Sequence, residues 1–342
     1  MIRRFLVTVL VGAVGLIGRA EGPEVSVLQW NIWQEGTMVP GGAEAIVDEI
    51  ARLQPDFVTL SEVRNYRGVD YTASLVRVLK ERGVEYYSFR TYDSGLLSRY
   101  PITDSLTVFP ENGDHGSIYR LLTEKEGWRI AVYTAHLDYL NDAYYDARGY
   151  DGSTWKERPL PASVEEILER NVRSQRDDAT RLFIDQARKD MAEGYSVVLG
   201  GDFNEPSHRD WTAATANMYD HNGFIVPWTV TTLLEEAGMV DAYRAVYPEV
   251  LTHPGFMYPS DVPGKAPEKV TWAPKADERD RIDYIWVSPD VEIMDAAIFG
   301  PKTSIAYGKV VEEAGADRFI EPLGVWPTDH KGLLVRLRLP NR

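Results

Sequence analysis

Apolar and polar positions alternate along the chain in two different rhythms, and their order predicts a mixed α/β fold. Residues 25–32 and 57–63 are short apolar runs of strand length. Between them, the apolar residues from 43 to 53 recur every three or four positions, as on one face of a helix, and Pro55 ends that helix. The chain therefore opens with a predicted strand–helix–strand unit.

Strand-like segments dominate the rest of the chain. A second helix is predicted around Leu79 and ends at Gly83, and a third begins where Ser163 and Glu166 have capping-box spacing. The predicted strands are residues 85–90, 95–98, 103–109, 117–123, 128–135, 197–200, 282–288, 293–299 and 333–339.

Two long segments break this rhythm. Residues 139–161 are rich in Tyr, Asp, Gly and Pro, and residues 253–280 also contain several prolines, so both are predicted to be loops. We find no internal repeat and no interior linker. The simplest prediction is one α/β domain over residues 21–342, with two β-rich halves and both long loops projecting from one face.

The N-terminus has the pattern of an export signal. Two arginines precede the apolar residues 5–17, and Gly18 and Ala20 place small residues where a signal peptidase reads them. A membrane anchor is disfavoured because the apolar stretch is shorter than the roughly 20 residues needed to span a bilayer. We therefore expect residues 1–20 to be a signal peptide, leaving a secreted or periplasmic protein with no stable membrane span.

Composition narrows the classes of function. The chain has 37 Lys and Arg against 52 Asp and Glu, for a formal net charge of −15. This charge counts against a protein that passively coats nucleic acid, because such binding depends on cationic residues that neutralise phosphates. It leaves open a hydrolase that meets one phosphate through a bound cation. The chain has no cysteine, which excludes disulfides, thiolate metal sites and a cysteine nucleophile.

Polar side chains stand where several of the apolar strands end, which is where binding sites collect at the rim of a sheet. Taken singly, each is more often a turn residue or a structural histidine. As an ordered set they predict one site. The set is Asn31, Glu62, His136, Asp202, Asn204, Asp329 and His330.

These residues lie in stretches that together resemble the endonuclease/exonuclease/phosphatase superfamily, which includes pancreatic-type deoxyribonucleases, abasic-site nucleases, neutral sphingomyelinases and inositol-polyphosphate phosphatases. The resemblance implies a four-layered α/β sandwich of two packed β-sheets flanked by helices. It also implies metal-dependent hydrolysis of phosphate esters. The matching stretches are VLQWNI (27–32), FVTLSEV (57–63), GLLSRYPI (95–102), YTAHLD (133–138), VLGGDFN (198–204), RIDYIWVS (281–288) and TDH (328–330).

The resemblance assigns the metal site to oxygen ligands. Phosphate esters resist attack by nucleophiles because they are anions, and a hard cation neutralises that charge. Glu62 is implied as the main ligand, with Asn31 and Asp329 nearby. Mg²⁺ is the expected ion, with Mn²⁺ or Ca²⁺ as alternatives, since the chain has no cysteine and few histidines.

The catalytic roles also come from the resemblance. Asp202 would orient or deprotonate the attacking water, and Asn204 would steady that water or the phosphate. His330 would contact the phosphate, with Asp283 fixing its tautomer and charge. His136 would flank the phosphate from the other side; pancreatic-type deoxyribonucleases and sphingomyelinases carry His there, whereas abasic-site nucleases carry Tyr. Which histidine is the general acid, and whether one or two metals act, stays open.

The substrate is the least determined part of the prediction. The leading hypothesis is a phosphodiesterase for a small or lipid-derived ester. Alternatives are a phosphomonoesterase for a sugar or inositol phosphate, a secreted nuclease, and a binding protein that has lost catalysis, although the set of site residues is complete. The aromatic residues of 139–161 either pack on the domain or form a lip that stacks on a sugar, a base or a lipid head group. Asp138 is either a further site carboxylate or a turn residue, and His208 lies close enough to the Asp202 motif to be near the site.

Overall fold

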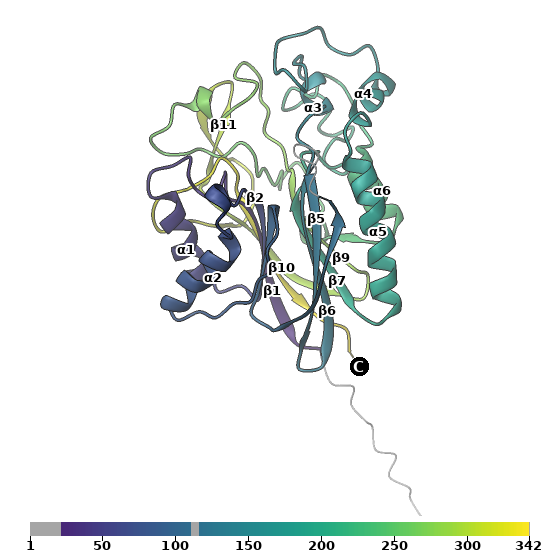
Figure 1. Cartoon of the computed structure of the whole chain (residues 1–342). Coiled ribbons are helices and arrows are strands. Elements are labelled where there is room, and N and C mark those ends of the chain that lie inside the picture. The colour runs from purple at the N-terminus through teal and green to yellow at the C-terminus, as the bar shows by residue number, and fades with distance from the viewer. Residues whose placement is uncertain (1–21, 111–115, 342) are drawn as a thin grey trace, which may run out of the picture.

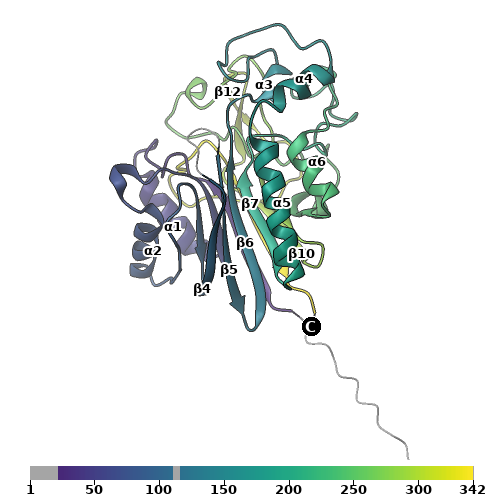
Figure 2. The same ribbon diagram turned by 45° about the vertical axis from the view of Figure 1, so that its right-hand side comes forward.

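Two β-sheets lie face to face at the centre of the molecule, with helices on both outer sides (Figures 1 and 2). The computed structural model describes residues 22–110 and 116–341. Within these residues each sheet has six strands. The layers run helix, sheet, sheet, helix, which confirms the predicted four-layered α/β sandwich. The predicted signal peptide lies outside the described residues.

The first sheet is mixed. In it, β1 pairs with β2 in parallel and with β14 antiparallel. In spatial order its strands are β13 (Phe319–Ile320), β10 (Glu292–Phe299), β14 (Gly332–Arg338), β1 (Glu24–Asn31), β2 (Phe57–Val63) and β3 (Asp93–Ser98).

The second sheet repeats this arrangement with other segments. Here β6 pairs with β7 in parallel, and β7 pairs with β9 antiparallel. In spatial order its strands are β4 (Ile102–Phe109), β5 (Gly116–Lys125), β6 (Trp128–Leu137), β7 (Ser196–Asp202), β9 (Asp283–Val287) and β8 (Val240–Asp241). A separate hairpin is formed by β11 (Thr303–Ala306) and β12 (Lys309–Glu312).

The longer helices cover the outer faces of the two sheets (Figure 1). Ile46 of α1 and Leu79 of α2 pack on the first sheet, whereas Phe183 of α5 and Leu234 of α6 pack on the second. The helices are α1 (Gly42–Leu53), α2 (Tyr71–Glu81), α3 (Ala143–Asp146), α4 (Val164–Asn171), α5 (Arg176–Ala192), α6 (Thr229–Glu236) and α7 (Ala242–Val246), with 3₁₀ turns η1 (Tyr66–Gly68) and η3 (Pro267–Lys269).

The apolar strand runs reflect burial on both faces. Successive side chains of a strand point to opposite faces of its sheet. Val27 therefore packs between the sheets, whereas Leu28 packs under the helices, and both are fully buried. The same holds for Val198, between the sheets, and Leu199, under α5 and α6. This is why these strands read as continuous apolar runs rather than as alternating ones.

Some predicted elements differ from the structure. Residues 85–90, predicted to be a strand, make only an isolated bridge between Tyr87 and Ser98. The apolar residues of this segment have another role. Tyr86 packs into the core, and its hydroxyl donates a hydrogen bond to the Pro55 carbonyl at 2.7 Å. The predicted loop 139–161 contains the short helix α3, and α6 was not predicted.

The predicted capping box is present at the start of α4. The Ser163 side chain accepts a hydrogen bond from the backbone N–H of Glu166, whose carboxylate in turn accepts one from the N–H of Ala162. Among the residues that the structure describes, no helix combines the length and apolar character needed to cross a membrane.

Candidate functional site

Parallel pairing brings four of the predicted residues to one edge of the two sheets. Asn31 is the last residue of β1, and Glu62 lies one position before the end of the neighbouring parallel strand β2. In the second sheet, His136 of β6 lies directly beside Asp202, the last residue of β7. The carboxyl ends of these strands therefore meet where the two sheets face each other.

Asn204 follows β7 two positions after Asp202, and the other three predicted residues reach the same edge from the opposite chain direction. Asp283 is the first residue of β9, which is antiparallel to β7 and places it beside Asp202. Asp329 and His330 precede β14 rather than follow a strand, but β14 is antiparallel to β1, so its start lies beside the end of β1. We call the eight gathered residues the floor: Asn31, Glu62, His136, Asp202, Asn204, Asp283, Asp329 and His330.

Ser61 joins the two sheets directly beneath the floor. Its hydroxyl accepts a hydrogen bond from the backbone N–H of Asp202 at 3.2 Å and donates one to the carbonyl of Ala135 at 3.2 Å. Gly200 of β7 permits this close approach, because a side chain there would collide with Thr59 of β2. The position of Asp202 is thus fixed by contacts with both sheets.

The backbone is strained at two floor residues. Glu62 has φ of 69° and Asn204 has φ of 47°, both in the left-handed region that residues other than glycine rarely adopt. Glu62 also sits at a β-bulge in the pairing of β2 with β3. Bulges re-aim side chains at sheet edges, and here the bulge directs Glu62 into the site.

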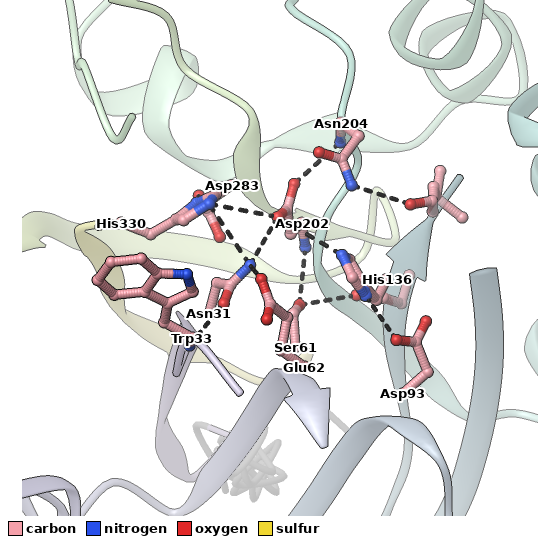
Figure 3. Close-up of polar contacts among 12 residues, drawn as sticks. Asn31, Trp33, Ser61, Glu62, Asp93, His136, Asp202, Asn204, Asp283 and His330 are labelled. Atoms are coloured by element: carbon pink, nitrogen blue, oxygen red, sulfur yellow. Dashed lines mark hydrogen bonds and ion pairs between the residues drawn. The ribbon is translucent and has the colours of Figure 1, made fainter. Parts of the chain in front are cut away.

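Asp202 lies at the centre of the floor (Figure 3). Its Oδ2 accepts a hydrogen bond from the Asn31 side-chain nitrogen at 2.9 Å. The same oxygen lies 3.9 Å from Nε2 of His136 and 3.8 Å from Nε2 of His330. Its other oxygen accepts a hydrogen bond from the backbone N–H of Asn204 at 2.9 Å. One carboxylate is therefore held between two imidazole rings.

His330 is oriented by Asp283, as predicted from the family resemblance. Nδ1 of His330 lies 2.8 Å from Oδ2 of Asp283, whose other oxygen accepts a hydrogen bond from the side chain of Gln29 at 3.2 Å. Burial opposes a charge on the ring, but the Asp283 and Asp202 carboxylates outweigh it and raise the pKa of His330 to about 10. The paired carboxylates therefore favour the charged imidazolium form of this ring.

His136 has a matching carboxylate that the sequence did not reveal. Nδ1 of His136 lies 2.9 Å from Oδ1 of Asp93, the first residue of β3, and Arg64 also contacts Asp93. Burial opposes a charge on this ring too, but Asp93 and Asp202 outweigh it and raise the pKa of His136. The available signal was a lone Asp ahead of the apolar run that starts at Gly95.

Glu62 and Asp329 supply oxygen atoms of the kind that hard divalent cations bind. Burial, reinforced by the Glu62 and Asp202 carboxylates and only partly offset by His330, raises the pKa of Asp329 to about 7. A cation between these carboxylates would remove their repulsion. The residues present therefore fit a divalent metal ion.

Two further features bear on that metal. The Asn31 amide turns its nitrogen toward Glu62 and Asp202, while its oxygen accepts a hydrogen bond from the N–H of Trp33 at 2.9 Å. Asn31 would need the opposite amide orientation to be a ligand. Asp202, Asp283 and His330 are buried, and each offers a ligand atom within 4.8 Å of the other two.

A pocket of about 330 Å³ opens above the floor. Asp142 at its wall is paired with the buried Arg176. Arg64 is the one Lys or Arg among the described lining residues, and it contacts Asp93 and Glu62. The charged lining residues are Glu62, Arg64, Asp142, Asp202 and Asp329, together with His136 and His330.

Comparison with known proteins identifies the family of this chain. The profile of the Endonuclease/Exonuclease/phosphatase family matches residues 28–330, a range that contains every floor residue. The chain belongs to the endonuclease/exonuclease/phosphatase family. Members of the family are metal-dependent phosphoesterases, and this chain is a metal-dependent phosphoric ester hydrolase.

Individual relatives of this family member are distant. It is 28% identical over 269 residues to an uncharacterized protein of Caenorhabditis elegans, covering 77% of this chain and 78% of the relative. Among solved structures, an endonuclease/exonuclease/phosphatase from Beutenbergia cavernae is 18% identical with a TM-score of 0.52, covering 93% of this chain and 72% of that one. TDP2 of D. rerio, solved with a single strand DNA product, is 19% identical with a TM-score of 0.50, covering 92% and 98%. These structures show the shared fold.

The aromatic residues of loop 139–161 divide between the two predicted roles in this family member. Tyr144, Tyr145 and Tyr150 are buried and pack on the domain. Tyr139 and Trp155 remain partly exposed and stack on each other, and they line the pocket together with the buried Tyr144 and Tyr145. The packing interpretation is therefore correct for the buried tyrosines, and the interpretation as a lip that stacks on a substrate stays a prediction for Tyr139 and Trp155.

Asp138 and His208 lie outside the pocket lining. Asp138 accepts a hydrogen bond from the N–H of Leu140 at 2.9 Å, which is the turn role. His208 contacts Thr231 and Glu235 on α6 instead of the floor. The expectation that His208 lies near the site is wrong, because the chain turns toward α6 after the Asp202 motif.

Proposed function

We propose that the protein is an exported phosphodiesterase that uses Mg²⁺ to hydrolyse a small or lipid-derived phosphodiester. The observation that carries the proposal is the arrangement around Asp202. One buried carboxylate lies between two imidazoles, and each imidazole is held by a buried carboxylate of its own. This places a proton acceptor between two imidazoles whose neighbouring carboxylates favour their charged form.

Glu62 and Asp329 would hold the metal ion in this reaction. When bound there, a divalent cation neutralises charge on the phosphate oxygens and so lowers the barrier to attack. The Asn31 amide, which donates to both Glu62 and Asp202, keeps the two carboxylates at a fixed separation. The strained backbone of Glu62 holds its side chain in that direction.

Asp202 would accept the proton of the attacking water. A base must lie within hydrogen-bonding reach of that water, and Asp202 lines the pocket. The Asn204 N–H bonded to Asp202 fixes the carboxylate, and the Asn204 side chain is itself tied to the Leu137 carbonyl at 2.9 Å. His330 and His136 would bind the phosphate oxygens from two sides, and one of them would protonate the leaving alcohol.

The charges of the pocket favour a substrate with one phosphate group over a duplex with many. The lining carries four carboxylates, of which Asp142 is already paired, and Arg64 is its one guanidinium in the described residues. The metal ion and the imidazoles would meet the one phosphate that reacts, and the described lining has no further Lys or Arg to bind additional phosphate groups. Double-stranded DNA also requires a basic surface, whereas this chain has a net charge of −15.

A nucleic-acid strand is the second candidate substrate. It is favoured by the likeness of the fold to D. rerio TDP2, which was solved with a single strand DNA product. A single strand differs from a duplex because its bases are free to stack on aromatic side chains. Such side chains line this pocket.

The test is a comparison of catalytic efficiency for four substrates with Mg²⁺: bis(p-nitrophenyl) phosphate, p-nitrophenyl phosphate, single-stranded DNA and plasmid DNA. We expect the small diester to exceed both the monoester and the plasmid, at low and at moderate salt. Efficient plasmid nicking that falls steeply with salt would replace the proposal with a nuclease. A higher efficiency for the monoester would replace it with a phosphatase.

Export is tested separately. Expressed with residues 1–20, the protein should be recovered outside the cytoplasm with a mature N-terminus near Glu21. Recovery from the membrane fraction with Met1 intact would favour an anchor instead. Single-domain folding of the mature chain is tested by thermal unfolding, which should show one transition.

A further inference from the structure

Three aromatic residues from the two long loops form a continuous stack beside the floor. The rings of Tyr139 and Trp155 are parallel, with an interplanar angle of 1° and centroids 6.1 Å apart. Trp155 stacks in turn on Trp272, with centroids 4.5 Å apart. All three line the same pocket as Asp202 and His330. We call Tyr139, Trp155 and Trp272 the aromatic shelf.

The shelf is held rigidly by the loop that carries Trp155. Trp155 has φ of 52°, an unusual conformation for an aromatic residue, and its N–H donates a hydrogen bond to the Asp151 carbonyl at 2.8 Å. The Asp151 side chain accepts hydrogen bonds from the N–H groups of Ser153 and Thr154. The turn therefore fixes the ring of Trp155 in place.

Contacts between the two loops fix Trp272 against Trp155. The N–H of Lys275 donates a hydrogen bond to the Tyr150 hydroxyl at 3.2 Å, and the Lys275 ammonium pairs with Glu157 at 2.5 Å. Deeper in the structure, the buried Arg148 pairs with Asp280 at 2.8 Å. The stack is thus built before any ligand arrives, which lowers the entropic cost of binding.

The exposure of Trp272 is what points to a ligand. Two other loop aromatics of the same pocket lining, Tyr144 and Tyr145, are buried at 2% and 1% exposure. Trp272 is 51% exposed, although it lies at a pocket and its ring stacks on Trp155. A large apolar ring left half in water at a preformed pocket is typical of a binding surface.

We infer that the aromatic shelf binds a planar ring carried by the phosphodiester, a nucleobase or an aryl group, while the floor acts on the phosphate. This inference rests on the proposed phosphodiesterase function. Stacking on an aromatic ring tolerates different bases and needs no cation. It therefore suits a pocket whose described lining contains one guanidinium group. The shelf therefore determines substrate choice and takes no part in the chemistry.

The first experiment compares Trp272→Ala with the wild type on two diesters: bis(p-nitrophenyl) phosphate, which has planar rings, and glycerophosphocholine, which has none. We expect kcat/KM to fall about tenfold for the aryl diester, mainly through KM, and to stay within about twofold for glycerophosphocholine. Trp272→Phe should retain most of the efficiency. Tyr87→Ala, which removes a 45% exposed aromatic outside the pocket, is the matched control.

The second experiment needs no catalysis. Ligand-observed nuclear magnetic resonance titrations with adenosine and with glucose, neither of which has a phosphate, measure binding to the wild type and to Trp272→Ala. Adenosine should bind the wild type, with at least a tenfold weaker affinity for the variant, and glucose should not bind detectably.

The outcomes separate the two proposals. If the wild type hydrolyses no diester but binds adenosine through Trp272, the phosphodiesterase proposal fails and the shelf stands as a ring-binding site. An equal loss of efficiency for both diesters, no loss for either, or adenosine binding that is unchanged in Trp272→Ala would overturn the shelf. Glucose binding as strong as that of adenosine would overturn its assignment to a planar ring.

Discussion

The floor and the aromatic shelf line the same pocket but are held in place by different kinds of contact. The floor residues come from the ends of six strands, and the sheet hydrogen bonds position them before their side chains interact. The shelf residues come from two loops and are positioned by a turn at Asp151 and by bonds between the loops. Strand ends move little, whereas loops differ readily between related proteins.

Substitutions in the floor and in the shelf should therefore change different kinetic constants. Changes in the floor should lower kcat, because its side chains contact the reacting groups. Changes in the shelf and in the contacts that support it should raise KM for particular esters, because they alter binding alone. The predictions below test that division, from the largest expected effect to the smallest.

Asp202→Asn should have the largest effect. Asparagine keeps the size of the side chain and a bond from Asn31, but it cannot accept the water proton. We expect kcat to fall on the order of 10³-fold while KM changes little. Asp185→Asn, an exposed change on α5, is the matched control. If the Asp202→Asn variant keeps more than a tenth of the wild-type kcat, Asp202 is not the base.

The two histidine partners should differ in importance. Asp283 is fully buried and pairs with His330, whereas Asp93 contacts both His136 and Arg64. We expect Asp283→Asn to lower kcat about 100-fold and Asp93→Asn about tenfold, since each removes a charge that favours the imidazolium. Steady-state kinetics at saturating Mg²⁺ measure both. The reverse order would assign the main phosphate contact to His136.

Arg148→Leu should separate binding from chemistry. It leaves the buried Asp280 carboxylate without its cation, and we expect a loss of about 3–5 kcal/mol in the free energy of unfolding. KM for an aryl diester should rise several-fold, because Arg148 also bonds the Asp277 carbonyl and so fixes the loop that carries Trp272. Chemical denaturation and kinetics well below the melting temperature provide the two readouts.

A second change controls for that prediction. The double variant Arg148→Leu, Asp280→Asn removes the unpaired charge and should recover part of the lost stability. A fall in kcat as large as the rise in KM would show that the loops also position the floor. That result would contradict the division of roles.

The sequence predicted part of the floor from local signatures at strand ends, whereas Asp283 was named only through the family resemblance. A buried strand reads as an apolar run, and a polar residue at its end stands out, as at Glu62 and Asp202. Asp93 lacked that signature: its strand begins with two polar residues, and the segment before it imitated a strand because Tyr86 packs into the core. Its pairing with His136 exists only after the two sheets have packed.

The shelf was predicted only in part, because the aromatic residues of loop 139–161 were expected as a possible lip but Trp272 was not. Stacking of Trp155 on Trp272 joins two loops that are far apart in the sequence, and neither loop has a periodic pattern. The same holds for the direction of the Asn31 amide, which depends on the N–H of Trp33 and the neighbouring carboxylates. Contacts of this kind follow from tertiary packing, which sequence periodicity does not report.

The most direct test of the central claim, a metal-dependent phosphodiesterase centred on Glu62, is the Mg²⁺ dependence of Glu62→Gln. Purified wild type, Glu62→Gln and the exposed control Glu236→Gln would be titrated with Mg²⁺ after chelator treatment, with bis(p-nitrophenyl) phosphate as substrate. Glu62→Gln should lose most of its activity, on the order of 100-fold, and need more Mg²⁺ for half-maximal rate, with little change in melting temperature. Full activity of Glu62→Gln at the Mg²⁺ concentration that saturates the wild type would contradict the claim.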